Sequence, residues 1–372
     1  MRIGIDARIL GYRQGGIAQY TTHLLTALST IDPRTDYYVL HSRRERDRRR
    51  FGPNFHSVTL WTPPHHRLER WSLGIEVSRL GLDLLHSPDF IPPAFGARRF
   101  VITVHDLNFI YYPQFLTVES RRYYADQIAW AVHKAHHILT VSEATRRDVI
   151  RLLNVPPEKV TTIHLAADPA FRPLPRPMVL ETLNRYGLRP GYLLFVGTLE
   201  PRKNLPGLFT AYRRLLDRGV TDAPLVIVGG RGWLYEEVFT SMEDLRLTDR
   251  VRFLDTVPNA DLPSLYNGAS LFALPSFYEG FGLTALEAMA CGVPVVVSNR
   301  GSLPEMVGEA GVQVDPDDPE GIAEGMATVL CDPGLRQQLE RLGKARATAF
   351  SWDRTARGTL EVYRRVLAEG GE

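Results

Sequence analysis

Cysteine is scarce in this chain of 372 residues, which contains only Cys291 and Cys331. Two cysteines cannot form a disulfide framework, and their spacing is not that of metal ligands. The composition therefore excludes a disulfide-stapled secreted module and favours a reducing, cytoplasmic location. We expect both cysteines to be packing residues.

Long apolar runs and complete nucleotide-binding fingerprints are also missing. The sequence has no run of about 18 apolar residues, so no bilayer-spanning segment is expected and any membrane contact is expected to be peripheral. The start, MRIGIDARIL, lacks the apolar core and cleavage site of an export signal. Without a full G-x-G-x-x-G or G-x-x-x-x-G-K-[ST], a dinucleotide-dependent dehydrogenase and a P-loop NTPase are disfavoured.

Charge is unevenly divided along the chain. Residues 1–180 hold 24 Lys and Arg against 16 Asp and Glu, whereas residues 181–372 hold 20 against 26. The basic first half favours an anionic partner, for which a membrane surface is one candidate. Its densest run, residues 43–50, is interrupted by Glu45 and Asp47 and has no interleaved aromatic residues, so no nucleic-acid partner is expected.

Length and periodicity predict the architecture. One hydrophobic core rarely organises 372 residues, so two domains are expected. Short β-rich runs alternate with stretches of helical period, which predicts an α/β fold of two Rossmann-like domains with largely parallel sheets. The expected strands are residues 2–7, 37–41, 58–61, 83–86, 100–104, 138–141, 160–164, 192–196, 225–228, 251–254, 271–274 and 295–297.

Proline marks the expected domain boundary. Residues 168–177 contain four prolines and cannot continue a helix or a central strand. We expect an N-terminal domain over 1–175 and a C-terminal domain over 176–350. Residues 351–372 are predicted to be a helix that packs back toward the N-terminal domain, with Ser351 as its N-cap.

Ligands of doubly wound sheets bind beyond the carboxyl ends of the strands. After the first strand, Gly15 and Gly16 precede a predicted helix, where freed N–H groups favour an oxyanion; a mere tight turn is the equal alternative. After the fifth strand, His105 is placed to hydrogen-bond a sugar hydroxyl, and Asp106 to orient the histidine.

The second half offers two further loops. Arg202 and Lys203 precede Asn204, a candidate helix cap. Two cations suit a pyrophosphate, because hydrogen bonds to ionised groups contribute about 1.5–3 kcal/mol each, against about 1 for neutral ones. A solvent-facing pair of cations is the alternative.

The most informative stretch is SFYEGFGLTALEAMACGVPVV, residues 276–296. Glu279 precedes two glycines that flank Phe281, which we expect to be exposed. Glu287 follows on a predicted helix, where it could accept hydrogen bonds from a ribose diol while Glu279 lies at the other end of the same nucleotide sugar. An ordinary acidic first helical turn is the alternative.

No metal site is expected. His133, His136 and His137 have no Cys or Glu to complete a ligand set. The only Asp-x-Asp, at Asp315 and Asp317, is explained by turn formation and helix capping.

These motifs resemble the retaining glycosyltransferases of family four, which have the GT-B fold of two Rossmann-like domains facing each other across a cleft. The family hallmark is two glutamates separated by seven residues, as at Glu279 and Glu287, and EGFGLTALEAMACGVPVV matches the family pattern almost residue by residue. EPRKN, TVSEATRRDVI, the HD after the fifth strand and GGIAQY extend the likeness over nearly the whole chain.

The resemblance implies catalytic roles for His105, Lys203 and Glu279, with Glu279 and His105 beside the transferred sugar. The implied donor-binding residues are Gly15, Gly16, Thr198, Arg202, Lys203, Phe281, Gly282, Leu283 and Glu287. Among them, Lys203 and Arg202 neutralise the pyrophosphate, Gly16 lies against the phosphates and Glu287 binds the ribose. Many members have arginine where this chain has Thr198, so a thinner positive cluster is expected.

The implied reaction is retaining transfer of a hexose from a nucleotide-diphosphate sugar to a glycan or lipid-linked acceptor, with no metal and no cofactor. The resemblance also implies that the domain over 1–175 binds the acceptor and that the domain over 176–350 binds the donor. GDP-mannose is the first choice of donor, with UDP-glucose close behind. The tyrosine pairs at 111–112 and 123–124, near Arg121 and Arg122, fit an anionic or lipid-linked acceptor, and helix packing explains them equally well. A GT-B nucleotide-sugar epimerase and a non-catalytic nucleotide-sugar-binding protein are the alternatives.

Overall fold

The computed structural model describes residues 1–12, 15–45, 48–116 and 118–369. The chain forms two compact units, each described here by itself. Unit 1 comprises Met1–Ile110, Val118–Leu165 and Ser351–Glu372, and unit 2 comprises Tyr111–Thr117 and Ala166–Phe350. The boundary falls at residue 165 and not at 175, because the prolines near 175 precede the next helix, which has Pro175 as its N-cap.

Unit 1 is built on a seven-stranded parallel sheet in the order β3-β2-β1-β4-β5-β6-β7. Its strands are β1 (Arg2–Asp6), β2 (Asp36–Ser42), β3 (Phe55–Leu60), β4 (Leu82–Ser87), β5 (Ala97–Val104), β6 (His137–Thr140) and β7 (Val160–Thr162). Its helices are α1 (Gly16–Ile31), α2 (Glu69–Val77), α3 (Asn108–Tyr111), α4 (Val118–Lys134), α5 (Glu143–Leu153) and α14 (Trp352–Ala368).

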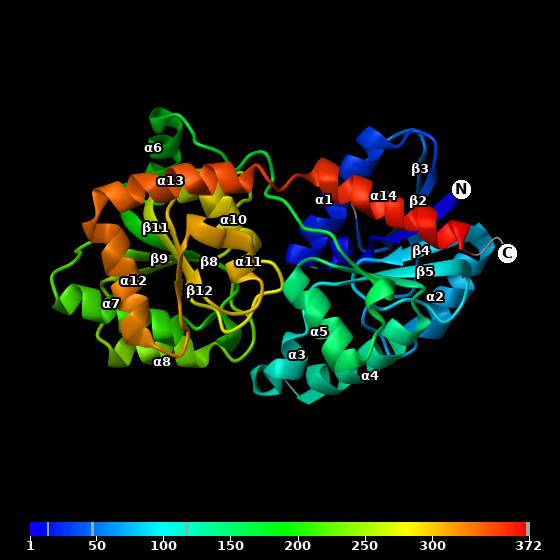
Figure 1. Cartoon of the computed structure of the whole chain (residues 1–372), viewed down its shortest axis with the longest axis horizontal. Coiled ribbons are helices and arrows are strands. Elements are labelled where there is room, and N and C mark those ends of the chain that lie inside the picture. The colour runs from blue at the N-terminus through cyan, green and yellow to red at the C-terminus, as the bar shows by residue number, and fades with distance from the viewer. Residues whose placement is uncertain (13–14, 46–47, 117, 370–372) are drawn as a thin grey trace. The chain divides into compact units, whose positions relative to one another are not determined.

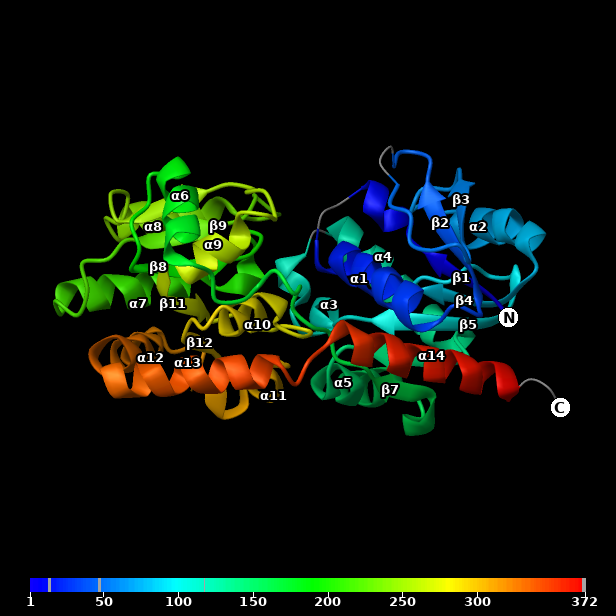
Figure 2. The same ribbon diagram turned by 90° about the horizontal axis from the view of Figure 1, so that it is seen from above.

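Helices cover both faces of this sheet, because consecutive strand residues point to opposite sides. Leu85 of β4 packs with Leu73 and Val77 of α2 in a buried cluster. The next residue, His86, lies with its Nδ1 2.6 Å from the hydroxyl of Tyr363 in α14. Thus α2 and α14 lie on opposite faces, and α14 runs beside α1 (Figures 1 and 2).

The C-terminal helix is part of unit 1. The Ser351 side chain accepts a hydrogen bond from the Arg354 N–H at its start. The fully buried His86 links Tyr363 to Thr103 of β5, 2.8 Å from its Nε2, and burial lowers the pKa of His86 to about 3. The helix is therefore anchored by a neutral histidine as well as by its apolar face.

Unit 2 has a six-stranded parallel sheet in the order β10-β9-β8-β11-β12-β13. Its strands are β8 (Tyr192–Val196), β9 (Leu225–Val228), β10 (Val251–Leu254), β11 (Ala269–Leu274), β12 (Val295–Ser298) and β13 (Val312–Val314). Its helices are α6 (Arg176–Arg185), α7 (Leu205–Asp217), α8 (Glu236–Asp244), α9 (Leu262–Asn267), α10 (Leu283–Ala290), α11 (Leu303–Val307), α12 (Pro319–Cys331) and α13 (Pro333–Ala347).

The interior strands of unit 2 are apolar except for Ser270 of β11 and Ser298 of β12, which is typical of a parallel sheet covered on both faces. Every residue of β8, β9 and β12 is buried. In Figure 1, α7 and α12 lie on one side of these strands and α10 and α11 on the other. The sheet thus holds the loops at its carboxyl edge on a rigid base.

The predicted α/β class with parallel sheets is confirmed. All twelve expected strands are present, and the edge strand β13 was not expected. Within the described ranges, no helix combines the length and apolar character needed to cross a bilayer.

Candidate functional site

The loops that follow β8 and β11 form one structure, because these strands are neighbours in the sheet. The Phe277 N–H donates to the Arg202 carbonyl at 2.9 Å. Asn204, at φ 54°, caps α7 by accepting from the Gly207 N–H, and its amide donates to the carbonyls of Pro275 and Pro316. The predicted cap is present and also fastens the two loops together.

At this junction a glutamate lies between two cations. Glu279 accepts from Lys203 Nζ at 2.6 Å through Oε1 and from Arg202 Nη1 at 2.7 Å through Oε2. Arg202 also donates to Glu200 at 2.6 Å and to the Tyr278 carbonyl at 2.7 Å. We call Glu200, Arg202, Lys203 and Glu279 the ion cluster of unit 2.

The ion cluster is buried: Lys203 is 8% exposed and Glu279 7%. The two cations are therefore not a solvent-facing pair. Burial alone would raise the pKa of Glu279, but the charges of Arg202 and Lys203 outweigh it and lower the pKa to about 2. Glu279 is thus an anion at any physiological pH. The second carboxylate of the cluster, Glu200, was not among the residues predicted from the sequence.

Two glycines shape the loop between Glu279 and α10. Gly282 is the N-cap of α10 at φ 85°, a conformation that L side chains rarely adopt. Gly301, at φ 61°, approaches so closely that a Cβ there would meet the Glu279 carbonyl oxygen at 2.8 Å. The Ser302 hydroxyl donates to the same oxygen at 2.9 Å, so the backbone of Glu279 is fixed from a third loop.

Phe281 is not exposed as expected. It is 5% exposed, and its ring meets that of Phe350 edge to face at 5.7 Å. The apolar contact of this ring explains why the loop turns the aromatic inward. Leu283 begins α10 and is half-buried.

Glu287 lies on the second turn of α10 and is 4% exposed. The Tyr266 hydroxyl of α9 donates to its Oε2 at 2.9 Å. Burial, with a smaller contribution from Asp168, raises the pKa of Glu287 to about 8. The two glutamates of one motif therefore differ in their preferred charge, because only Glu279 has cations beside it.

Thr198 is exposed, next to the point where the loops after β8 and β9 run side by side. A Cβ on Gly229 would lie 2.0 Å from the Gly197 carbonyl oxygen, so only glycine allows this approach. The adjacent glycines at 229 and 230 are the sequence signal for this close approach, and the sequence-based prediction did not include them.

In unit 1, Gly15 is the N-cap of α1 and is extended, with φ −161°. Gly16 is the first residue of the helix, and a Cβ on either glycine would meet nothing within 4 Å. Neither a positive φ nor packing requires glycine at these two positions, while residues 13 and 14 of the preceding turn lie outside the described residues. Such positions leave room for close approach to the helix N-terminus.

His105 follows β5 as predicted. Its Nε2 lies 3.0 Å from the Pro88 carbonyl, and Tyr20 meets its ring edge-on at 5.0 Å. Burial lowers the pKa of His105. Asp106 does not orient the histidine by a hydrogen bond; it accepts from the Asn108 N–H and amide, at 3.1 and 2.7 Å, at the start of α3.

Four of the five side chains considered as metal ligands have other partners. Arg300 pairs with Asp315 at 2.7 Å and with Asp317 at 2.5 Å. His136 accepts from the Phe100 N–H, while His137 lies beside Thr161 and Arg365. In the part of the chain that the structure describes, no group of three or more His, Cys, Asp or Glu side chains could hold a metal ion.

Two family models match the chain. Residues 14–171 match the Glycosyltransferase Family 4 model, and residues 185–346 match the model of the group 1 glycosyl transferases. The O-antigen chain mannosyltransferase B of Escherichia coli is 38% identical over 302 residues, which are 81% of this chain and 78% of that protein. A D-inositol 3-phosphate glycosyltransferase of Salinispora tropica is 35% identical over 64% of this chain and 52% of its own length.

Solved structures share the fold at lower identity. The sucrose-phosphate synthase of Thermosynechococcus elongatus superposes with a TM-score of 0.81 at 20% identity, covering 99% of this chain and all of that one. Anabaena HepE in complex with UDP and glucose gives 0.75 at 18%, covering 98% of this chain and all of its own.

Proposed function

We propose the specific reaction of this chain from its family. The chain belongs to the glycosyltransferases, because its first part matches the Family 4 model and its second part the group 1 model, and it is therefore a transferase with the GT-B fold. It moves a hexose from a nucleotide-diphosphate sugar to a glycan or lipid-linked acceptor, with retention of the anomeric configuration and without a metal ion. GDP-mannose is the preferred donor. The 38% identity to an O-antigen chain mannosyltransferase supports the choice of mannose.

The ion cluster of unit 2 carries this proposal. Breaking a sugar–phosphate bond leaves extra negative charge on the departing diphosphate, and the enzyme must stabilise that charge with fixed groups. Lys203 is an ammonium with three N–H donors, one of which reaches Glu279 at 2.6 Å. The diphosphate accepts from its remaining donors, and the N-terminus of α10 supplies further N–H groups to the same anion.

Arg202 has a different part in this reaction. Its guanidinium holds Glu200, Glu279 and the Tyr278 carbonyl together. It therefore fixes Glu279 beside the transferred sugar and adds positive charge behind it. With retention, the acceptor hydroxyl attacks from the face that the leaving group vacates, and a donor phosphate oxygen takes its proton.

A thermal-shift panel tests the donor. GDP, UDP, ADP and dTDP, each with its sugar, are added to the full chain, because a ligand at 100 times its Kd stabilises the folded state by about 2.7 kcal/mol. We expect GDP-mannose to give the largest shift, and release of GDP in the presence of methyl α-mannoside as a surrogate acceptor. The absence of any nucleotide-sugar shift, or loss of turnover with EDTA, contradicts the proposal.

An exposed apolar face of unit 1 supports membrane contact by this enzyme. Leu68, Trp71 and Ile75, on one side of α2 and its N-cap, are 58–62% exposed, and Phe95 packs on Trp71 with ring centroids 6.3 Å apart. Trp61, 70% exposed, is tied to α2 through the Glu76 carboxylate. We call these five side chains the aromatic patch.

The charges around the aromatic patch fit an anionic lipid surface at the inner face of the membrane. Arg43 lies 5.1 Å from the Trp61 ring, and Arg67 and Arg79 flank the exposed side of α2. Both carboxylates of α2 are engaged: Glu69 pairs with Arg8, and Glu76 accepts from two backbone N–H groups. Aromatic side chains with flanking arginines are typical of peripheral helices that lie in the headgroup region.

Co-sedimentation with vesicles tests this contact. Trp71→Ser is expected to lower binding to vesicles rich in phosphatidylglycerol about tenfold, because burying a large apolar side chain contributes about 1.5–3 kcal/mol. The matched control is Met178→Ser, which replaces another exposed apolar side chain (52% exposed, against 62% for Trp71) in unit 2. Equal binding by the two variants contradicts the assignment.

A further inference from the structure

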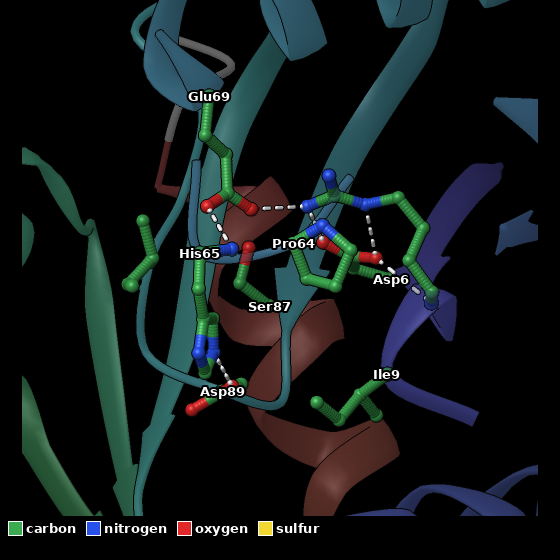
Figure 3. Close-up of a pocket in the computed structure, with 9 residues that line it drawn as sticks. Asp6, Ile9, Pro64, His65, Glu69, Ser87 and Asp89 are labelled. Atoms are coloured by element: carbon green, nitrogen blue, oxygen red, sulfur yellow. Dashed lines mark hydrogen bonds and ion pairs between the residues drawn. The ribbon is translucent and has the colours of Figure 1, made fainter. Parts of the chain in front are cut away.

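A small polar pocket lies in unit 1 where β1 and β4 end (Figure 3). The sheet order places these strands side by side, and the chain leaves them toward opposite edges of the sheet. This is the switch point at which doubly wound sheets bind ligands. The pocket encloses about 10 Å³, close to the space that one water molecule or one hydroxyl group occupies.

Ser87, the last residue of β4, supplies the strongest sign that something binds there. Its side chain is 2% exposed and lines the pocket. Among the described residues, its Oγ has no hydrogen-bond partner. An unsatisfied buried hydroxyl costs about 1–3 kcal/mol, so a native protein keeps one where a ligand or a water completes it.

His65 and Asp89 form the mouth of the pocket. His65 Nε2 lies 2.5 Å from Asp89 Oδ2, and their side chains are 28% and 19% exposed, so solvent reaches this edge. The His65 backbone is held at φ 60° while its N–H donates to Glu69 at 2.7 Å. The buried Glu69 carboxylate thus holds the His65 backbone, and the ring extends from it to Asp89 (Figure 3).

The charge of the pocket selects against anions. Arg8 is its one arginine, and its guanidinium already donates to Asp6, to Glu69 and to the Thr62 carbonyl. Asp6, Glu69 and Asp89 leave the walls with more negative than positive charge. A phosphate is repelled here, whereas a neutral hydroxyl can donate to Asp89 and accept from Ser87.

We propose that this pocket binds one hydroxyl group of the carbohydrate acceptor, with Ser87 and Asp89 as its hydrogen-bonding residues and His65 as the residue that positions Asp89. The assignment to an acceptor rests on the proposed glycosyl transfer. The binding of a neutral sugar at this point rests only on unit 1.

Binding of methyl α-mannoside and methyl α-glucoside, followed by saturation-transfer NMR, tests the pocket without turnover. Ser87→Ala is expected to weaken binding of the better glycoside about fivefold, and Asp89→Asn about tenfold or more. Ser57→Ala, an exposed serine on β3, is the matched control and should leave binding unchanged. Because the Ser87 hydroxyl is unsatisfied, Ser87→Ala should also unfold at the same temperature as the parent protein or higher.

Thermal shifts of the same variants with GDP-mannose distinguish a failure of the pocket assignment from a failure of the proposed donor. An unchanged nucleotide shift with weakened glycoside binding supports the pocket. Glycoside binding that depends on Ser87 supports it even if no nucleotide sugar binds. Equal glycoside affinity in Ser87→Ala and the parent protein, no glycoside binding at all, or displacement of the glycoside by inorganic phosphate would overturn it.

Discussion

The two units share one winding, and each gathers charge at the same place on its sheet. In both sheets the first strand lies between the second and the fourth, and the loop after the first strand carries buried cations. The carboxylate that reaches them comes from the start of α2 in unit 1 and from the loop after β11 in unit 2. In unit 1 a cation, Arg8, lies between Asp6 and Glu69; in unit 2 an anion, Glu279, lies between Arg202 and Lys203. The central ion thus differs in sign, with carboxylates on either side of a cation in unit 1 and cations on either side of Glu279 in unit 2.

This reversal matches the chemistry that each unit is proposed to handle. A diphosphate needs cations, and a carbohydrate hydroxyl needs carboxylates or neutral partners. Overall composition points the other way, because residues 1–180 are basic and residues 181–372 acidic. Bulk charge therefore reports on surfaces such as the aromatic patch with its arginines, and not on the sites at the sheet edges.

Replacing Arg8 should have the largest of the predicted effects, a loss of free energy of unfolding, because it removes the central cation of unit 1. Arg8 is 1% exposed, and Arg8→Leu leaves two buried carboxylates without their cation, which costs about 3–5 kcal/mol. Urea unfolding followed by tryptophan fluorescence measures this, since four of the five tryptophans, Trp61, Trp71, Trp130 and Trp352, belong to unit 1.

The control is Arg357→Leu, which removes an exposed pair with Asp353 on α14 and should leave the unfolding midpoint almost unchanged, because solvent screens such a pair. Equal unfolding midpoints for the two variants would show that the buried cation of unit 1 is not structural.

Lys203→Ala tests the other half, where the cation serves the reaction. We expect kcat to fall by about two orders of magnitude, or about 2.7 kcal/mol of transition-state stabilisation, because the departing diphosphate loses its nearest ammonium. Arg202 still pairs with Glu279, so folding should survive. Steady-state turnover of GDP-mannose measures the effect, and the exposed Lys344→Ala is the control. Near-normal turnover in a folded Lys203→Ala protein contradicts the assignment.

The candidate site of unit 2 could be predicted from the sequence more fully than that of unit 1, for a physical reason. All four residues of the ion cluster of unit 2 come from two contiguous motifs, EPRKN and YEGFG, and a short motif can be read without knowing the fold. The pocket of unit 1 takes its residues from three separate segments: Asp6 from β1, His65 from the segment before α2, and Ser87 with Asp89 from the end of β4. The parallel pairing of β1 and β4 brings the first and the last of these together. Ser87 carries no sequence signal, because its lack of a partner is a property of the packed structure.

Smaller differences follow the same logic. The strands of both sheets were predictable from apolar runs, whereas β13 has three residues and only one buried side chain. Phe281 was expected to be exposed because glycines flank it, but the sequence could not show that Phe350, sixty-nine positions later, packs against it. Partners distant in sequence decide burial.

The smallest predicted effect concerns Glu287 and sharpens the contrast within unit 2. The pKa of Glu287 is about 8, so at pH 6.5 the unliganded protein holds it protonated, and ribose hydroxyls that donate to a carboxylate must first displace that proton. Affinity for GDP-mannose should therefore rise about tenfold between pH 6.5 and 8.5, measured by calorimetric titration. Glu279, whose pKa is about 2, is ionised throughout this range and contributes no slope. Glu287→Gln should bind more weakly at pH 8.5 and lose the pH dependence. A parent protein whose affinity is flat over this range would mean that Glu287 stays bonded to Tyr266 and does not reach the ribose.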